Sequence, residues 1–349
     1  MRCTISNVPL KVVANRSRIH GGCVRSQAAE SMVLLENSAV PHGLPIVSKA
    51  GGFVAVLGAG SNDTHLMVNR YTGSTQNAPS FLSGITARAA KDGLAVKYSE
   101  NDTSIAAGAA AVVVVVRSEN EGESHDRAVL TMRAEDSGVL LQLQQLQQAA
   151  AAKVQVVVVT VSGGPVDTSE PVAAMGAGGV VTSVVAAWQP GEEGGNALAA
   201  LLFGDDDFSG ALAVTAYKER FTQFVDIANI STVGRGYRYL ADKSLQLYPV
   251  GYGLSVHSKW ATPRLTWAGG QPPEGMRAAA LGGVRVVVTI KNVGVKAGSK
   301  PVLLFVQRKE GATDSSGVHS ANAALIIPTP LIQRLHSCYQ ELKSRHIPR

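Results

Sequence analysis

The amino-acid sequence predicts an α/β protein, a layered α/β sandwich with a mostly parallel sheet. Short Val-rich runs alternate with segments of helical character between about residues 25 and 217, and regular alternation favours parallel pairing of the strands. Of the 349 residues, 36 are glycine and only 5% are aromatic. This composition fits helices packed closely on a sheet better than it fits an aromatic-rich sandwich of two sheets.

The first half of the predicted domain begins with an amphipathic helix. Apolar residues from Arg25 to Leu35 have helical spacing, and residues 37–45 supply the turn that ends it. Residues 53–58 then form a buried strand, and Asn62, Asp63 and His65 fall on the loop after it. The next elements are a helix at 80–90, a strand at 94–98, a short helix at 104–110 and a fully buried strand at 111–116.

The second half continues the same alternation. Leu, Gln and Ala are strong helix formers and dominate residues 140–152. The following Val-rich run at 154–161 reads as another buried strand. The remaining elements are a strand at 180–188, a helix at 193–203 and a last extended piece at 211–215.

The amino-acid composition changes after Tyr217. Glycines and four of the eight tyrosines crowd the next stretch, and strands follow at 281–292 and 301–307. An immunoglobulin-like sandwich needs about seven strands over about 100 residues, which the remaining length does not comfortably hold. We therefore predict these domains: 1–24, a disordered or wrongly assigned amino end; 25–217, the α/β sandwich; 218–262, a Tyr/Gly-rich link; 263–310, a partial β module; 311–349, a disordered tail.

The positive charge of the chain lies at its two ends. The formal net charge is +6, yet residues 26–328 carry 23 basic and 25 acidic side chains. Nucleic-acid binding requires a basic stripe on a folded face, so we expect no nucleic-acid partner. The apolar run at 106–116 is too short to cross a bilayer, and no signal peptide is recognisable. The three cysteines lie in the same ends, and no metal or disulfide spacing is present.

The richest cluster of chemically active side chains directly follows the buried strand at 111–116. It reads Glu121-Gly-Glu123-Ser-His125-Asp126-Arg127. Loops at the carboxyl ends of parallel strands are where open α/β sheets bind ligands, so this acidic loop is the leading candidate site. A solvated charged loop is an equally weighted alternative, and His125 is the weakest member because exposed loop histidines usually have no role.

Three other motifs have competing interpretations. Gly191-Glu-Glu-Gly-Gly195 precedes a helix, where backbone N–H groups favour anions, but its spacing matches neither nucleotide-binding loop, and close helix packing against the sheet is preferred. Ser162-Gly-Gly-Pro lacks the Gly-x-Ser-x-Gly pattern of a nucleophile elbow. The tyrosines of the link could stack on sugar rings, but packing of an interdomain seam is the more common use.

Several motifs resemble the carboxyl-terminal half of glycoside hydrolase family 3. They are the acidic loop, the helix Gln27-Ala-Ala-Glu-Ser-Met-Val-Leu-Leu-Glu-Asn, the run Trp188-Gln-Pro-Gly-Glu-Glu-Gly-Gly-Asn-Ala, Leu202-Phe-Gly-Asp, and Tyr248-Pro-Val-Gly-Tyr-Gly-Leu-Ser. Asn62-Asp-Thr-His is similar to a run in xylosidases of that family. The resemblance implies hydrolysis of O-glycosyl bonds in β-xylosides or β-glucosides, without a cofactor or metal. It also implies that the partial β module is fibronectin type III-like, and that the protein is extracellular or secretory.

The resemblance also assigns roles within the acidic loop. Glu121 is the first candidate for general acid/base and Glu123 the second, because glycosidic hydrolysis places two carboxyl groups on opposite sides of the bond and one loop supplies only one side. Asp126 and Arg127 would hold the loop through charge-assisted hydrogen bonds. The family's nucleophile is an aspartate on a preceding barrel, which no residue here matches, so a separate barrel is an expected partner beside the carbohydrate. The alternative is a non-catalytic remnant that binds carbohydrate or a protein.

Overall fold

A computed structural model gives the structure of the chain. It describes residues 22–38, 43–47, 51–68, 78–118, 127–149, 154–175, 179–226, 228, 234–257, 264–267, 286–289, 292–294, 302–306 and 323–327. The chain forms two compact units, one of Met1–Val256 with Ser299–Arg349 and the other of His257–Gly298.

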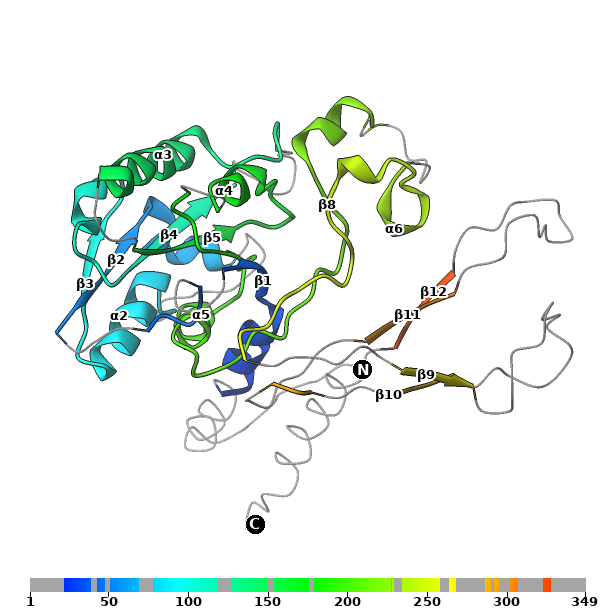
Figure 1. The fold of residues 1–349 in the computed structure, drawn as a ribbon, viewed down its shortest axis with the longest axis horizontal. Helices are drawn as coiled ribbons and strands as arrows, with labels where there is room; N and C mark the ends of the chain where they lie inside the picture. The colour runs from blue at the N-terminus through cyan, green and yellow to red at the C-terminus, as the bar shows by residue number, and fades with distance from the viewer. Residues whose placement is uncertain are drawn as a thin grey trace, which may run out of the picture. The chain divides into compact units, whose positions relative to one another are not determined.

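A six-stranded sheet organises the first unit (Figure 1). Its strands are β1 Val33–Asn37, β2 Phe53–Leu57, β3 Ala95–Ser99, β4 Ala111–Arg117, β5 Gln155–Val161 and β6 Ser183–Ala186. Their order is β1-β6-β5-β4-β2-β3. The strands β2 to β6 pair in parallel, whereas β1 is antiparallel to β6. The predicted layered α/β fold with a mostly parallel sheet is confirmed.

Helices cover both faces of this sheet. In β4, Val113 and Val115 belong to one apolar cluster with α2 (Phe81–Lys91) and α5 (Gly194–Leu202), while Val112 and Val114 belong to another with α3 (Ala134–Ala149). Figure 1 shows α3 and α4 (Ser169–Ala173) above the sheet and α2 and α5 below it. Because both faces are buried, the strands need continuous apolar runs rather than an alternating pattern.

Shorter elements lie in the connections and after the sheet. The 3-10 helices are η1 Ala59–Ser61, η2 Thr64–Met67, η3 Thr103–Ala106, η4 Glu219–Gln223 and η5 Lys243–Leu245. The segment after Tyr217 also contains the single-turn helix α6 Gly236–Tyr239. The strands β7 Ala216–Tyr217 and β8 Gln246–Tyr248 pair with each other in an antiparallel ladder.

Several predicted elements are shorter in the structure, including the helix predicted at 104–110, which is η3, and the strand predicted at 180–188, which is β6. Three others differ more. The first helix covers residues 22–31 and stops before Val33, because the next five residues form β1 and pair with β6. Residues 211–215 are not a strand; the extended piece begins one residue later, at β7. The helix predicted at 140–152 begins six residues earlier, at Ala134, with Glu135 and Asp136 in its first turn, where acidic side chains are favourable.

The turn after α5 ends the helix and connects it to its neighbours. Gly204 has a φ of 75°, and its N–H donates to the Leu201 carbonyl while the Asp205 N–H donates to the Ala200 carbonyl. This is the Schellman arrangement, in which a left-handed residue satisfies the last helical carbonyls. The sequence Phe-Gly-Asp is therefore a helix stop followed by an acidic run.

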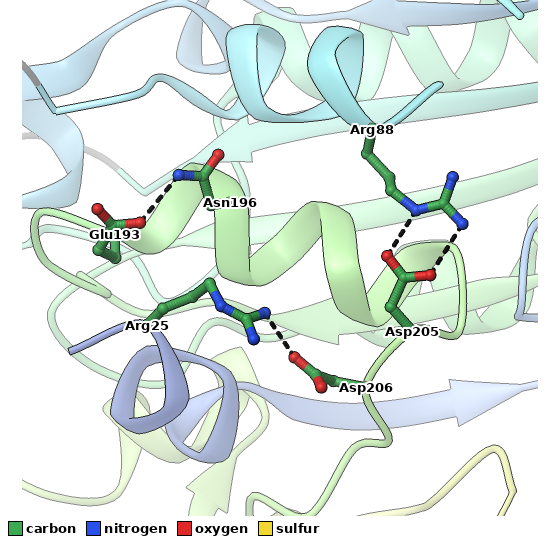
Figure 2. Close-up of polar contacts among 6 residues, drawn as sticks. All are labelled: Arg25, Arg88, Glu193, Asn196, Asp205 and Asp206. Carbon is green, nitrogen blue, oxygen red and sulfur yellow. Dashed lines mark hydrogen bonds and ion pairs between the residues drawn. The ribbon is translucent and has the colours of Figure 1, made fainter. Parts of the chain in front are cut away.

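Three consecutive aspartates in this run hold three different segments. Asp205 accepts two hydrogen bonds from Arg88 of α2, at 2.5 and 2.8 Å, and Asp206 accepts one from Arg25 of the first helix at 2.7 Å. Figure 2 shows these two carboxylates turned toward different helices. The Asp205 carboxylate raises the pKa of the Arg88 guanidinium. Asp207 accepts from the Ser255 hydroxyl and the Val256 N–H, so the run gathers both ends of the domain around α5.

Strand pairs follow the α/β domain in sequence. In the second unit, β9 (Arg264–Trp267) pairs antiparallel with β10 (Val286–Thr289). In the first unit, β11 (Val302–Val306) pairs antiparallel with β12 (Ala323–Ile327). The strands predicted within 281–292 and 301–307 are present, whereas β12 falls in the segment expected to be a disordered tail. The fibronectin type III-like assignment and the domain boundaries stay predictions.

Candidate functional site

The candidate site lies at the carboxyl edge of the parallel sheet, between β2 and β4. The connection from β2 leads to β3 on one side, and the chain then returns to β4 on the other side of β2. Crevices for ligands in open α/β sheets form at such a change of direction. The strand β4 pairs with both β2 and β5, so the loop that follows it leaves from the interior of the sheet, as predicted.

The loop after β2 packs against the end of β4. Gly58 has a φ of 96°, and a Cβ atom there would lie 2.2 Å from the Val115 carbonyl oxygen. At Gly60 a Cβ atom would lie 3.0 Å from the Arg117 Cγ. Gly58 therefore requires the small glycine, since the loop backbone approaches the β4 backbone directly there, whereas Gly60 lies against the Arg117 side chain. This contact brings the loop after β2 to the end of β4, where the acidic loop begins.

The polar residues predicted on the loop after β2 serve its local structure. The Asp63 carboxylate accepts from the His65 N–H at 2.9 Å and caps η2. The Asn62 side-chain oxygen accepts from the Ser80 hydroxyl at 3.2 Å, and Ser80 in turn caps α2. The His65 side chain is exposed. These contacts connect the loop to the start of α2.

The structure describes only the two ends of the acidic loop, residues 117–118 and residue 127, which are its first and second roots. Glu121, Glu123, His125 and Asp126 lie outside the described residues. At the first root, the Arg117 N–H donates to the Asp136 carboxylate at 3.0 Å, and the Ser118 N–H donates to the Val161 carbonyl at 3.2 Å. The loop therefore leaves β4 from a backbone that is tied to both α3 and β5.

Arg127 forms the second root. Its guanidinium donates to the Pro165 carbonyl at 3.1 Å, in the loop after β5. A Cβ atom on Gly164 would lie 3.0 Å from the same guanidinium, so a glycine leaves space for it. The predicted charge-assisted pair of Arg127 with Asp126 falls outside the described residues, but Arg127 itself bridges two loops at the carboxyl edge.

Asp136 is buried and accepts the hydrogen bond from the Arg117 N–H at the first root. It is 8% exposed, and burial raises the pKa of its carboxyl group, an effect that the Arg117 N–H and the charges of Arg117 and Arg133 partly offset. Asp136 lies 19 residues from Arg117 in the sequence. No motif in the sequence pairs the two, although a first-turn Asp in a helix is a recognisable capping signal.

The Asp136→Asn variant is expected to be more stable than the natural protein at about pH 7 and equally stable at about pH 3. The asparagine oxygen still accepts the Arg117 N–H but carries no charge. Because the folded-state pKa of Asp136 is raised, the folded state binds the proton more readily than the unfolded state. The contribution of Asp136 to the free energy of unfolding therefore decreases as the pH rises from about 3.9, the pKa of an Asp in the unfolded chain, through the pKa of Asp136 in the folded state. Urea unfolding at several pH values measures the difference.

The control for this experiment is Glu135→Gln, at the exposed neighbouring position in the same helical turn. That variant removes an exposed charge that pairs with Arg133 and relieves only the smaller of the two effects that raise the pKa of Asp136. Its stability relative to the natural protein should therefore rise with pH much less than that of Asp136→Asn. An Asp136→Asn protein that is less stable than the natural one at pH 7 contradicts the prediction.

The Gly191–Gly195 segment packs two helices together. Gly191 has a φ of 81°, and its N–H donates to the Met67 carbonyl at 2.8 Å. A Cβ atom on Gly195 would lie 2.3 Å from the carbonyl oxygens of Pro79 and Ser80, at the start of α2. The Glu193 carboxylate accepts from the Asn196 amide within the same turn (Figure 2). The prediction of close packing holds, but the partner is α2 rather than the sheet.

Two of the four tyrosines of the link, Tyr248 and Tyr252, pack on the α/β domain itself, whereas Tyr239 is exposed. The Tyr248 and Tyr252 rings are stacked with centroids 4.8 Å apart. Their hydroxyls donate to the Glu36 carboxylate and to the Leu35 carbonyl of β1, each at 3.0 Å. Burial raises the pKa of the Tyr248 hydroxyl. For Tyr248 and Tyr252, these contacts favour the packing interpretation over stacking on sugar rings.

A small pocket beside these tyrosines has room for about one water molecule. Its lining is mainly apolar and includes Trp188 and Tyr248. A sugar ring does not fit in it. Among the described residues, no group of three His, Cys, Asp or Glu side chains is arranged to hold a metal ion. Within those same ranges, no helix has the length and apolarity needed to span a membrane.

Comparisons with known proteins identify relatives of this arrangement. Residues 32–256 match the family model described as glycosyl hydrolase family 3 C-terminal domain. The chain is 40% identical over 126 residues to a xylan 1,4-beta-xylosidase of Xylanibacter ruminicola, covering 36% of this chain and 13% of that protein. It is 28% identical over 313 residues to the beta-xylosidase/alpha-L-arabinofuranosidase 1 of Medicago sativa subsp. varia, covering 80% of this chain and 39% of that protein.

The fold is also found in solved structures. The chain aligns with the beta-D-glucoside glucohydrolase from Trichoderma reesei with a TM-score of 0.62 and 23% identity, over 89% of this chain and 48% of that protein. This likeness concerns the fold. The chain spans less than half the length of each of these three proteins.

Proposed function

Because this chain belongs to the glycosyl hydrolase family 3 C-terminal domain family, we propose that it supplies the general acid/base of a glycosidase active site. The substrates are β-xylosides or β-glucosides. The complementary half of the site, with the nucleophile, comes from a barrel domain. The carbohydrate lies between the acidic loop and that barrel.

One observation carries this proposal: the acidic loop leaves the sheet at its change of direction, from an interior strand with both roots tied down. The described roots are Arg117 with Ser118 on one side and Arg127 on the other. A catalytic group has to be held in place by its supporting structure. The loop therefore has the anchoring that a positioned carboxyl group requires.

The chemistry assigns one carboxyl group to this chain. Glycosidic hydrolysis needs an acid that protonates the leaving oxygen and a second carboxylate on the other face of the sugar. Glu121 takes the acid/base role, and Glu123 is the next candidate. Asp126 and Arg127 position the loop, and His125 is at most a neighbour of the substrate.

The relatives support the substrate class. Two of them are named as xylosidases and one as a glucoside glucohydrolase. The Asn62-Asp-Thr-His run, similar to one in xylosidases, favours β-xylosides over β-glucosides. The family resemblance implies a barrel domain as the partner. The relatives have room for such a further domain, since each is more than twice as long as the part that matches this chain.

The test joins residues 25–349 to the amino-terminal part of the Medicago sativa relative. We expect this chimaera to hydrolyse 4-nitrophenyl β-D-xyloside at least about 1,000-fold faster than residues 25–349 alone, since the covalent route requires the nucleophile. Release of 4-nitrophenol measures the rate, and the β-D-glucoside provides the specificity comparison. A chimaera that folds but is no faster than the isolated segment contradicts the proposal and favours a non-catalytic carbohydrate- or protein-binding role.

A further inference from the structure

A closed ring of hydrogen bonds joins three segments beside the acidic loop. The Leu130 carbonyl accepts from the Asp167 N–H at 2.7 Å. The Asp167 carboxylate accepts from the Glu219 N–H at 2.6 Å. The Glu219 carboxylate accepts from the N–H groups of Leu130 and Thr131, at 2.5 and 3.2 Å. The ring therefore returns to the residue where it begins.

Asp167 is the rigid member of this ring. It is 6% exposed, and its other carboxylate oxygen accepts from both the N–H and the hydroxyl of Ser169. It also forms a parallel β-bridge with Thr131. Both of its oxygens have donors, so its side chain has no freedom to follow a displaced neighbour.

The ring fixes the segment on which the acidic loop ends. Arg127 already donates to the Pro165 carbonyl, so residues 127–131 follow the loop after β5 with contacts at both ends. Glu219 is the only member of the ring that comes from outside these two loops, at the first residue of η4. Hydrogen bonds to a charged acceptor are stronger than neutral ones. The Glu219 carboxylate therefore acts as a clamp, in that it holds the backbone of residues 130 and 131 against η4.

We propose that Glu219 is a positioning residue for the general acid/base, acting through the backbone of residues 130 and 131. The inference rests on the proposed function of the acidic loop. Displacement of a reacting group by about 1 Å costs about 100-fold in rate, so a clamp at the loop root changes turnover without touching the substrate. Glu219 is also the second residue of the predicted 218–262 link, so the position of the link and the position of the loop are coupled.

The first experiment measures amide hydrogen exchange by NMR in the chain as it stands. In Glu219→Ala, exchange at the Leu130 and Thr131 amides should rise about tenfold or more, because both lose their acceptor. Glu219→Gln keeps an oxygen acceptor and should restore most of the protection. The matched control is Asp242→Ala, which removes the acidic N-cap of η5, another 3-10 helix of the same segment, and should leave the two amides unchanged.

The second experiment measures xyloside hydrolysis by the same variants in the chimaera. Glu219→Ala should lower kcat about tenfold with less than about a twofold change in KM, and Glu219→Gln should recover most of the loss. If Glu219→Ala shows the same amide exchange and the same kcat as Asp242→Ala, the inference is overturned. Failure of the proposed function is seen separately, as turnover in the chimaera that does not depend on Glu121 or Glu123.

Discussion

Replacing Glu121 by Gln in the chimaera is expected to lower kcat/KM for xylobiose by about 100- to 10,000-fold, the usual contribution of a general acid. Glutamine has nearly the same shape but no proton to give. Bond cleavage in xylobiose requires protonation of a poor leaving group. With 2,4-dinitrophenyl β-D-xyloside, whose leaving group departs without a proton, the loss in kcat/KM should be less than about tenfold. The ratio of the two losses identifies an acid rather than a structural residue.

The control is Glu123→Gln, which changes the second carboxyl group of the same loop. If Glu121 is the acid, this variant should affect both substrates to a similar and smaller extent. If the dependence on leaving group follows Glu123 instead, the role passes to the second candidate. Equal losses on both substrates for both variants would contradict an acid in this loop.

The parallel sheet could be predicted because its strands are buried on both faces. Runs such as Val112 to Val116 have no alternation, so their burial on both faces follows from composition alone. The acidic loop follows one of these runs, which is why its place at the carboxyl edge was predictable. The identity of the neighbouring strands was not, because pairing is determined by the whole set of connections.

The start of the domain shows the limit of local patterns. Residues 28–35 have apolar side chains at helical spacing, yet the last three of them belong to β1. Short apolar runs are compatible with both structures, and pairing with β6 decides between them. The strand β12 escaped prediction for the same reason, since its register with β11 is a contact distant in sequence.

The supporting residues of the site are harder to read from sequence than the site itself. Asp136 acts on Arg117, and Glu219 acts on Leu130 across 89 positions. Neither carboxylate belongs to a local motif that names its target. Asp167, in Asp-Thr-Ser, carries a weak capping signal because it accepts from Ser169 two residues later. Contacts of this kind emerge only when the loops are brought together.

Gly195→Ala is expected to destabilise the domain by about 3 kcal/mol, a large part of a typical domain's stability. The new methyl group would lie 2.3 Å from the Pro79 and Ser80 carbonyl oxygens. These are backbone atoms, and the Ser80 side chain caps α2 through the Ser83 N–H, so the obstacle does not yield by a rotamer change. Urea unfolding followed by circular dichroism measures the loss.

Gly138→Ala is the matched control for the loss at Gly195. It places the same methyl group within α3, where nothing lies within 4 Å, and should stabilise the domain by about 0.5–1 kcal/mol through helix propensity. A loss at Gly195 no larger than about 1 kcal/mol would contradict backbone contact between α2 and α5.

The partner position in α2 makes the steric explanation specific. A Cβ atom on Gly84 would lie 2.2 Å from the Gly195 carbonyl oxygen, so Gly84→Ala should cost a similar amount. Both methyl groups are accommodated by the same separation of α2 from α5. The double variant should therefore lose less than the sum of the two single losses, as expected for residues that share one contact. Additive losses would mean that the two glycines are required for independent reasons.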